Sequence, residues 1–517
     1  MRRYRLLLAA LLLWPMSAYA ATPVDGLYQQ HCASCHHAER LGGSGPALLP
    51  ENLTRLSPQK VEQVIRDGRA ATQMPGFATQ LTDEQIQQLT ALVRSPLPQI
   101  PTWDMAAMTE SHQLFIDRRQ LPEQPVHHAD PLNLFIVIEQ GDHHATILDG
   151  DRLESIHRFA TPIAVHGGPK FSPDGRFVFI ASRNGWIMQF DLYSLQVVAQ
   201  VRAGINTRNL AISDDGTTVM VANYLPHTLV VLDAHDLRPR KVIPVTHQQH
   251  SSRVSAVYTA APRHSFIVAL KDLQQVWEIP YSNQAKPVIT ALVHDYRAES
   301  GEDLPIDKTP FPIRRIHLNN YLDDFFFDAS YTHLLGASRD GGRGEVVHLD
   351  VGRPIASVDL PGLPHLGSGI TWPWRGTTVM ATPNLKEPVV SIIDMKSWQV
   401  VQRIATAGPG FFLRSHEQTP YAWVDASLSS EKDKIQLIDK ETLTVAHTLQ
   451  PIPGKPASHV EFTRDGRFAL VSIQSADGAL VIYDAHTLTE VKRLPMNMPS
   501  GKYNVANKIN RSSGTSH

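Results

Sequence analysis

The chain has 517 residues, more than one small domain needs, and its 42% apolar and 19% charged residues are typical of a folded protein rather than a disordered one. Its 48 Lys and Arg residues against 50 Asp and Glu residues leave a formal charge of −2, which gives no electrostatic basis for binding nucleic acid. Its two cysteines exclude a disulfide framework larger than one bridge.

Residues 1–20 predict an export signal peptide. A basic start (Arg2, Arg3, Arg5) precedes the apolar run Leu6–Leu13, and Ala18-Tyr19-Ala20 is typical of a cleavage site. The apolar run is too short to span a bilayer comfortably, although an uncleaved anchor remains an alternative. Cleavage removes three arginines and no acidic residue, so the formal charge changes from −2 to −5. We therefore expect a mature protein with no membrane span, located in a bacterial periplasm.

Both cysteines lie in one motif, Cys32-Ala33-Ser34-Cys35-His36. The C-x-x-C-H pattern attaches c-type haem, because two cysteine sulfurs form thioethers to the vinyl groups and the adjacent imidazole ligates the iron. A disulfide between Cys32 and Cys35 is the alternative. The motif follows an export signal directly, which favours covalent haem c with His36 as a metal ligand.

Three helices are predicted around this motif, over residues 23–31, 57–69 and 81–93. The second is amphipathic, and Thr82 is a plausible N-cap for the third. Such a small helical unit is typical of a cytochrome c. We assign residues 21–95 to an all-α cytochrome c domain.

The sixth iron ligand is predicted to be Met74, in Gln73-Met74-Pro75-Gly76-Phe77. Proline and glycine break the chain where cytochromes c present their methionine, and thioether ligation raises the haem potential. A gap-filling core methionine is the alternative. His31 and His37 are also candidates, but they lie too close to the motif to reach the opposite haem face easily.

Residues 96–103 predict a linker, since Pro96, Pro98 and Pro101 occur within it. After the linker the chain repeats, because apolar segments ending in aspartate recur at Asp149, Asp191, Asp233, Asp350, Asp394, Asp439 and Asp484. Their spacings of 42, 42, 44, 45 and 45 residues are typical of four-stranded propeller blades. One further unit, residues 265–281, is followed by a long insertion that includes residues 299–309. We therefore predict an all-β eight-bladed propeller over residues 104–517.

Loops of successive blades converge on the axis of a propeller, where ligands bind. The polar candidates for this place are rich in histidine and arginine: His166, Arg183, Arg208, Arg253, Lys271, His317, Arg339, Arg414 and His416. A solvated or core role is the ordinary alternative for any single histidine among the 25 in the chain.

A C-x-x-C-H cytochrome followed by an eight-bladed propeller resembles the cytochrome cd1 nitrite reductases and the related dihydro-haem d1 dehydrogenases. The matching stretches are residues 163–166, 206–209, 252–256, 266–271, 411–416, 421–426 and 501–505. The resemblance implies that His166 is the proximal iron ligand of a d-type haem. It also implies that Arg208, Arg253 and Lys271 bind the carboxylates of the macrocycle, with Arg183 and Arg414 as further cofactor-binding candidates.

The sequence differs from the nitrite reductases of this family at two positions, and these differences favour one kind of enzyme over the other. Nitrite reductases hold two histidines over the distal face of haem d1, where they supply protons. One of these histidines should fall within residues 254–266. Ala261 aligns with the expected position, and His264 lies three residues further on. The other should fall within residues 313–328, where His317 or Asp323 matches. We therefore expect at least one distal histidine to be missing, which favours the dehydrogenase.

The dehydrogenase reading implies that a haem d1 precursor is the substrate. A propionate of dihydro-haem d1 is oxidised to an acrylate, and the electrons pass through the covalent haem c to a periplasmic acceptor. Nitrite reductase is a possible acceptor of the product. His416 and Tyr503 are the candidate catalytic residues, because both lie in matching stretches and both can move protons. Nitrite reduction to nitric oxide and a non-catalytic d-type haem carrier or electron-transfer protein remain alternatives.

Overall fold

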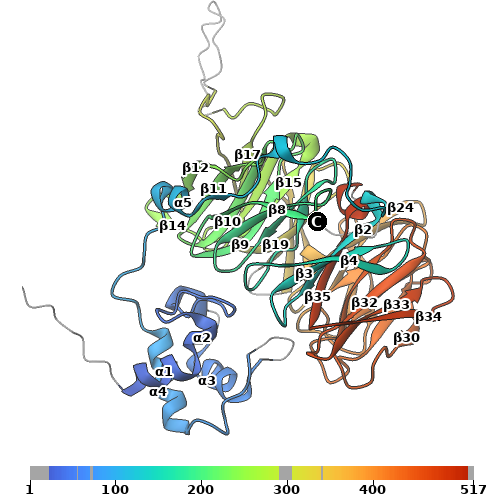
Figure 1. Ribbon diagram of the computed structural model, residues 1–517, viewed down its shortest axis with the longest axis horizontal. Coiled ribbons are helices and arrows are strands. Elements are labelled where there is room, and N and C mark those ends of the chain that lie inside the picture. The colour runs from blue at the N-terminus through green and yellow to red at the C-terminus, as the bar shows by residue number, and fades with distance from the viewer. Residues whose placement is uncertain (1–22, 55, 70–73, 290–305, 339–341, 511–517) are drawn as a thin grey trace, which may run out of the picture.

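The computed structural model describes residues 23–54, 56–69, 74–289, 306–338 and 342–510 (Figure 1). The predicted signal peptide, Arg339 and residues 299–305 of the predicted insertion lie outside the described residues. No helix within these ranges is both long and apolar enough to cross a membrane.

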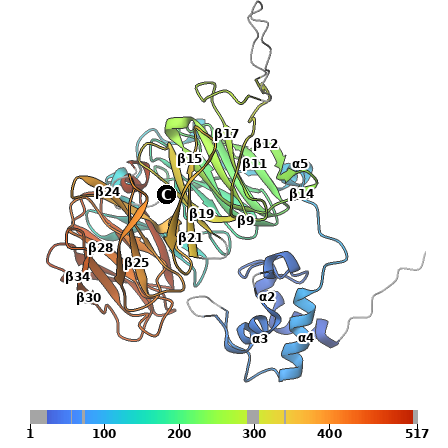
Figure 2. The same cartoon turned by 180° about the vertical axis from the view of Figure 1, so that it is seen from behind.

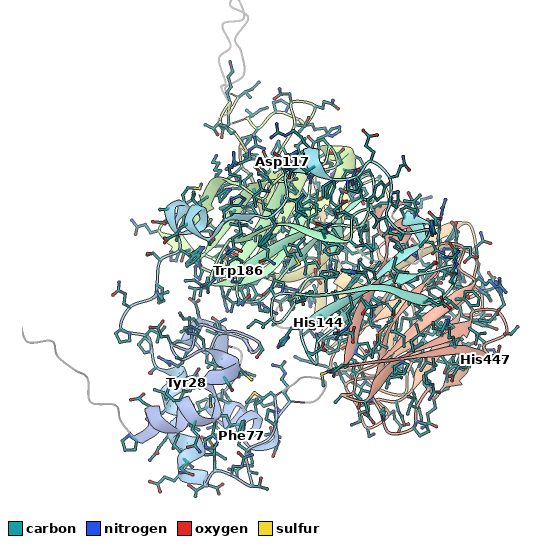
Figure 3. The ribbon with its side chains drawn as sticks, viewed as in Figure 1. Tyr28, Phe77, Asp117, His144, Trp186 and His447 are labelled. Carbon is teal, nitrogen blue, oxygen red and sulfur yellow. The ribbon has the colours of Figure 1, made fainter. Side chains whose placement is uncertain are left out.

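A small helical domain comes first. Its elements are α1 (Pro23–His31), α2 (Ala33–His36), η1 (Pro50–Leu53), α3 (Pro58–Asp67) and α4 (Asp83–Arg94). The three predicted helices are therefore confirmed. The predicted N-cap of α4 is also confirmed, because Thr82 Oγ1 accepts the Gln85 amide at 3.3 Å and the Gln85 side chain accepts the Thr82 amide at 2.9 Å. Tyr28 and Phe77 belong to the buried core of this domain (Figure 3).

The rest of the chain forms eight antiparallel blades arranged in a ring (Figures 1 and 2). The first four, each given from its inner strand outward, are β35 (Pro499–Asn504), β2 (Leu134–Glu139), β3 (His144–Asp149), β4 (Glu154–Ala160); β5 (Lys170–Phe171), β6 (Phe177–Ala181), β7 (Trp186–Asp191), β8 (Gln196–Arg202); β9 (Asn206–Ile212), β10 (Thr218–Leu225), β11 (Thr228–Asp233), β12 (Pro239–Pro244); and β15 (Val254–Ala260), β16 (Ser265–Leu270), β17 (Gln275–Pro280), β18 (Arg314–His317).

The other four blades are β19 (Leu322–Phe327), β20 (His333–Ser338), β21 (Gly342–His348), β22 (Arg353–Leu360); β23 (Ile370–Trp374), β24 (Thr377–Pro383), β25 (Val389–Asp394), β26 (Gln399–Ala405); β27 (Leu413–Arg414), β28 (Tyr421–Asp425), β29 (Ile435–Asp439), β30 (Thr444–Leu449); and β31 (Ala457–Phe462), β32 (Phe468–Ile473), β33 (Gly478–Asp484), β34 (Glu490–Met496). Shorter elements are α5 (Met105–Ser111), β1 (Gln113–Leu114), η2 (Arg118–Gln120), η3 (Pro131–Asn133), β13 (Thr246–His247), β14 (His250–Ser251), η4 (Ala261–Arg263), η5 (Leu366–Ser368) and α6 (Val505–Asn510).

The predicted eight-bladed propeller is confirmed. Six of the repeating aspartates end the third strand of a blade, as Asp149 ends β3 and Asp191 ends β7. The ring is closed by its two ends, since β35 pairs with β2 in the first blade and Tyr503 lies opposite Ile136. Because the last strand of the chain pairs with the first strands of the propeller, the ring closes without an open sheet edge between the first and last blades.

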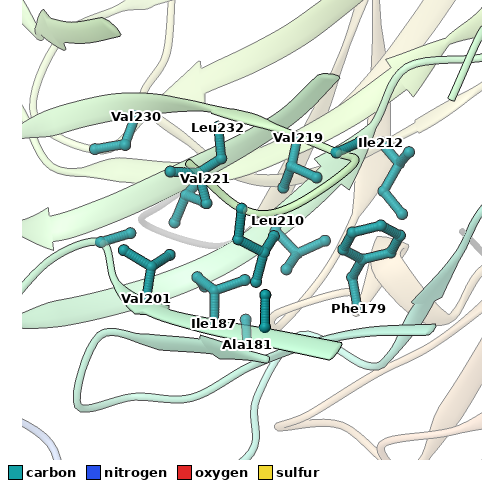
Figure 4. Close-up of a cluster of buried hydrophobic side chains, with 14 of the residues drawn as sticks. Phe179, Ala181, Ile187, Val201, Leu210, Ile212, Val219, Val221, Val230 and Leu232 are labelled. Carbon is teal, nitrogen blue, oxygen red and sulfur yellow. The ribbon is translucent and has the colours of Figure 1, made fainter. Parts of the chain in front are cut away.

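Apolar side chains fill the spaces between neighbouring blades. Between the second and third blades, Ile187 and Val201 pack with Leu210, Val221 and Val230 (Figure 4). Burying such side chains contributes roughly 1.5–3 kcal/mol each. The resulting stack of blades holds the inner strands, and hence the residues at their ends, in fixed positions.

The cytochrome domain packs against the third blade. Leu41, Ala47 and Leu49, in the loop that follows the C-x-x-C-H motif, form one buried cluster with Ile205 and Leu225. The chain between α4 and α5 forms no helix or strand. The loop next to the covalent haem motif is therefore seated at the end of the propeller where the inner strands begin.

Candidate functional site

Of the two cysteines of the C-x-x-C-H motif, Cys32 is the N-cap of α2 and Cys35 lies within this helix. The structure forms no disulfide between them. The disulfide alternative is thus not supported. Cys32 is partly buried against the core of the helical domain, and Cys35 is exposed. Their spacing on one helical turn suits two thioether bonds to the same macrocycle.

His36 has the geometry of an iron ligand. Its ring is buried, and its Nδ1 lies 2.7 Å from the Pro46 carbonyl oxygen. Donating its hydrogen to that carbonyl leaves a lone pair on Nε2. Burial lowers the pKa of His36, so the imidazole is neutral and able to bind metal. Gly45 lies against the ring, where a Cβ would come within 2.5 Å of it.

Met74 lies partly buried at the edge of the same core, to which Cys32 and Phe77 also belong. A soft thioether donor in this domain fits the sixth coordination position. The assignment of Met74 as ligand remains a prediction. His31 contacts the Phe77 ring edge to face, with centroids 5.9 Å apart.

His166 lies at the start of the second blade, between two guanidinium groups. Its Nδ1 is 2.7 Å from the Arg208 carbonyl oxygen, and its Nε2 is 2.8 Å from Arg183 Nη2. Burial and the charges of Arg183 and Arg208 hold the pKa of His166 well below its usual value. The ring is therefore neutral, with hydrogen on Nδ1 and an electron pair on Nε2 that can bind iron.

Arg183 and Arg208 are suited to carboxylates. Among the described residues neither makes an ion pair with an acidic side chain, although both lie deep beside His166. Burial lowers the pKa of Arg183 to about 10, which leaves it charged at neutral pH. A buried guanidinium is costly unless an anion pairs with it. The surroundings of His166 thus fit a tetrapyrrole that carries several carboxylates.

Arg253 and Lys271 are brought to the same place but already have acidic partners. Arg253 forms a two-pronged ion pair with Asp272, at 2.8 and 2.7 Å, and Lys271 lies 2.9 Å from Asp323. These two cations therefore contribute less uncompensated positive charge than Arg183, whereas the charges of Asp324 and Asp323 also act on Arg208.

Tyr224 joins this group and was not foreseen. Three cations surround its ring, with Arg183, Lys271 and Arg253 at 5.6, 5.4 and 5.9 Å from the centroid. Although burial raises it, the charges of Lys271, Arg208 and Arg183 together lower the pKa of Tyr224 to about 8. No motif marks this residue, since it lies near the end of the ordinary apolar strand β10.

His365 provides a second imidazole near His166, while the expectation that at least one distal histidine is missing stays a prediction. Its Nδ1 lies 2.6 Å from the Phe411 carbonyl oxygen, which leaves Nε2 as the free electron pair. Burial lowers the pKa of His365, and its charge acts on His166. His365 lies outside the two sequence windows in which a distal histidine was expected.

The residues within those windows lie elsewhere or have another role. Ala261 and His264 belong to the turn after β15, where His264 Nδ1 is 3.2 Å from Asp214. His317 ends the outer strand β18, next to His247. Asp323 does reach the site, but as the partner of Lys271.

Tyr503 lies beside the His166 loop. A Cβ on Gly168 would come within 2.9 Å of the Tyr503 ring, so the glycine permits this contact. His459 packs edge to face on Tyr503 at 5.2 Å and contacts Phe412 at 4.5 Å. Burial raises the pKa of Tyr503 to about 12. Burial and the charges of Lys502 and Arg414 hold the pKa of His459 well below its usual value, which keeps the ring neutral.

His459 adopts φ = 49°, the left-handed region that a histidine rarely occupies. Such a conformation costs of order 1–3 kcal/mol and is common at functional sites. Beneath it, Arg414 Nε and Glu461 Oε2 are buried, 4.0 Å apart, and have no hydrogen-bond partner among the described residues. The Tyr503 side of the site thus holds several unsatisfied polar groups.

The structure does not bring His416 to this cluster. His416 lies in the turn after β27, at the opposite end of its inner strand from Phe411 and Phe412. Its ring packs against Gly466, where a Cβ would come within 2.2 Å of Nδ1. Burial lowers the pKa of His416. Its position suits a role in holding the turn.

Two sequence families match the chain. The family described as "Cytochrome D1 heme domain" matches residues 129–301 and 305–508, which cover the propeller. The family described as "Cytochrome C oxidase, cbb3-type, subunit III" matches residues 20–93, which cover the helical domain.

The curated relatives include both kinds of enzyme considered above. A dihydro-heme d1 dehydrogenase of Pseudomonas aeruginosa is 54% identical over 512 residues, covering 98% of each chain. A nitrite reductase of Stutzerimonas stutzeri is 24% identical over 538 residues, covering 94% of this chain and 92% of its own. A solved structure, "Dihydro-heme d1 dehydrogenase NirN in complex with DHE", is 55% identical with a TM-score of 0.79 and covers 94% of this chain and 100% of its own.

Proposed function

The chain belongs to the cytochrome D1 heme domain family, and from this premise we propose that it is a periplasmic dihydro-haem d1 dehydrogenase of haem d1 biosynthesis. Identity of 54% along both domains with a dihydro-heme d1 dehydrogenase is the observation that carries the proposal. The site also supports the proposal, because its arginines suit the carboxylates of the proposed substrate and its imidazoles suit the iron.

The reaction removes two hydrogens from a propionate. A –CH₂–CH₂– unit becomes –CH=CH–, and two protons and two electrons leave the substrate. When bound, the covalent haem c of the helical domain accepts the electrons one at a time and passes them to a periplasmic acceptor. Cys32, Cys35, His36 and Met74 hold that haem.

The beginnings of the inner strands bind the substrate. His166 would hold the iron through Nε2, and His365, from another blade, carries a second Nε2 with a free electron pair. Arg183 and Arg208 pair with substrate carboxylates through charge-assisted hydrogen bonds. Arg253 and Lys271 add to the positive field while staying paired with Asp272 and Asp323.

The protons leave through the His459 and Tyr503 pair. The neutral His459 imidazole lies in edge-to-face contact with the Tyr503 phenol, so the pair places a proton acceptor beside a proton donor. We assign the role once expected for His416 to His459, because His459 lies beside Tyr503 whereas His416 lies at the far end of its strand. Tyr503 keeps its proposed role.

Contact between the two domains supports electron transfer. The loop that carries Leu41, Ala47 and Leu49 follows the haem c motif and packs on Ile205 and Leu225. A Cβ on Gly43 would come 4.0 Å from Ile163 Cδ1, three residues before His166. The covalent haem is therefore held next to the loop that binds the substrate iron.

One imidazole, His365, lies near His166, so the choice between the two reactions does not rest on the histidines. The dehydrogenase is favoured on other grounds, namely 54% against 24% identity. Nitrite reductase is proposed only as a possible acceptor of the product.

The test compares His459→Gln with His416→Gln. Purified protein is mixed with dihydro-haem d1 without nitrite, and reduction of haem c is followed in a single turnover. We expect rapid reduction in the unmutated protein, a fall of about 10²-fold or more in His459→Gln, and a nearly normal rate in His416→Gln. A normal rate in His459→Gln would remove it from the reaction, and no haem c reduction in the unmutated protein would refute the proposed function.

A further inference from the structure

A cavity of ≈ 590 Å³ opens at the end of the propeller axis opposite His166. The residues that line it follow their inner strands, as Ser213 follows β9 and Ala261 follows β15, whereas Arg208 and Arg253 lie at or before the beginnings of the same strands. A space of this size holds water beside the polar groups of its mixed polar and apolar walls. The cavity is thus separate from the place where the substrate binds.

Two lysines line this cavity, Lys170 from β5 and Lys508 from α6. Both side chains are half-buried. Asp214 and Asp328 also line the cavity, and each faces a histidine, His264 at 3.2 Å and His333 at 3.0 Å. Basic and acidic side chains, both of which exchange protons with water, therefore line the same cavity.

Lys508 belongs to both the cavity and the site. Its Nζ lies 5.6 Å from the centroid of the Tyr503 ring, and the charge of Lys508 acts on His459. Lys170 continues the series, since its Nζ lies 5.8 Å from the centroid of Tyr258, which also lines the cavity. The side chains of Lys508, Lys170 and Tyr258 thus form a series that leads from Tyr503 into the cavity.

The other end of the axis is poorly suited to release protons. Arg183, Arg208 and Arg253 concentrate positive charge there, and the cytochrome domain packs beside them. A proton moving in that direction meets like charge in a region of low dielectric constant. The two protons of each turnover therefore need a different route from the two electrons.

We propose that protons from the propionate leave through this cavity, with Lys508 passing them from Tyr503 to the cavity water. The inference rests on the proposed dehydrogenation, which releases two protons and two electrons per substrate; the electrons go to haem c and the protons go to solvent. Burial and the charge of Arg414 hold the pKa of Lys508 well below its usual value. The lowered pKa makes the Lys508 amine easier to deprotonate than an exposed lysine, and its contact with the Tyr503 ring places it between that ring and the cavity.

The test uses full-length holoprotein with dihydro-haem d1 and an artificial electron acceptor in steady state. In Lys508→Met we expect kcat to fall about tenfold or more, with KM and the haem c spectrum unchanged. Added methylamine, which can enter the vacated space and carry protons, should restore much of the rate. Lys508→Arg should stay slow because a guanidinium does not release its proton at neutral pH.

Ile509→Ala is the matched control, because it changes an apolar residue of the same helix that lines the same cavity. It should keep a nearly normal kcat. A second variant, Lys170→Met, should also slow turnover. A normal kcat in Lys508→Met, or a slow rate that arginine restores and methylamine does not, would overturn the route while leaving the dehydrogenase intact. Absence of any turnover in the unmutated protein would instead refute the function on which it rests.

Discussion

Arg183 donates a hydrogen bond to Nε2 of His166 over 2.8 Å, the same nitrogen that we propose as the iron ligand. The Arg208 carbonyl fixes the other nitrogen at 2.7 Å. Binding of the macrocycle therefore replaces one guanidinium contact and frees Arg183 to pair with a substrate carboxylate. Ligation and carboxylate recognition are coupled through this single hydrogen bond.

Replacing His166 should separate the two haem sites. In His166→Ala we expect a weakened and spectrally altered d-type complex, while the haem c spectrum stays unchanged because its ligands belong to the other domain. Titration with dihydro-haem d1, followed by absorption, measures this. An unaltered d-type spectrum and affinity would exclude His166 as the ligand.

The arginines should differ in their effect on affinity. Arg183→Ala or Arg208→Ala removes a charged hydrogen bond worth about 1.5–3 kcal/mol, roughly ten- to a hundredfold in Kd. The double variant Arg253→Ala/Asp272→Ala removes a pair that is already neutral overall and should lose less. Equal losses in all three would contradict the distinction between paired and unpaired cations.

Tyr224 should make precursor binding sensitive to pH. Its pKa of about 8 means that it becomes anionic above that pH, and the phenolate then competes with substrate carboxylates for Lys271, Arg208 and Arg183. We expect affinity to be full below about pH 8 and to fall above it. Tyr224→Phe should keep its affinity over the same range; an identical decline in Tyr224→Phe would assign the effect to another group.

Met74→Ala should remove the weak near-infrared band that sulfur ligation gives to oxidised haem c. The covalent haem should remain, because Cys32 and Cys35 are untouched. Absence of this band from the unmutated protein would exclude Met74 as the sixth ligand.

Local patterns predicted most of the architecture. The haem motif, three helices and the Thr82 cap depend on residues close in sequence, and the blades repeat at a nearly constant interval. The candidate binding residues His166 and Arg208 could be named because they stand in stretches that resemble a known family, and Arg183 was named among the polar residues expected near the axis.

Residues brought together from distant blades could not be identified in this way. Tyr224, His365 and His459 follow no motif, and each reaches the axis only because the ring of blades closes. His416 was chosen for its place in a matching stretch, two residues after Arg414. The strand β27 ends between them, so His416 lies in the turn that follows the strand.

The most direct test of the central claim is mass spectrometry of the tetrapyrrole after incubation of purified protein with dihydro-haem d1 and an electron acceptor, without nitrite. The account predicts a product lighter by two hydrogen atoms, formed repeatedly per protein and released into solution. Recovery of unchanged dihydro-haem d1, together with tightly held haem d1 and nitrite turnover in the protein as isolated, would contradict it.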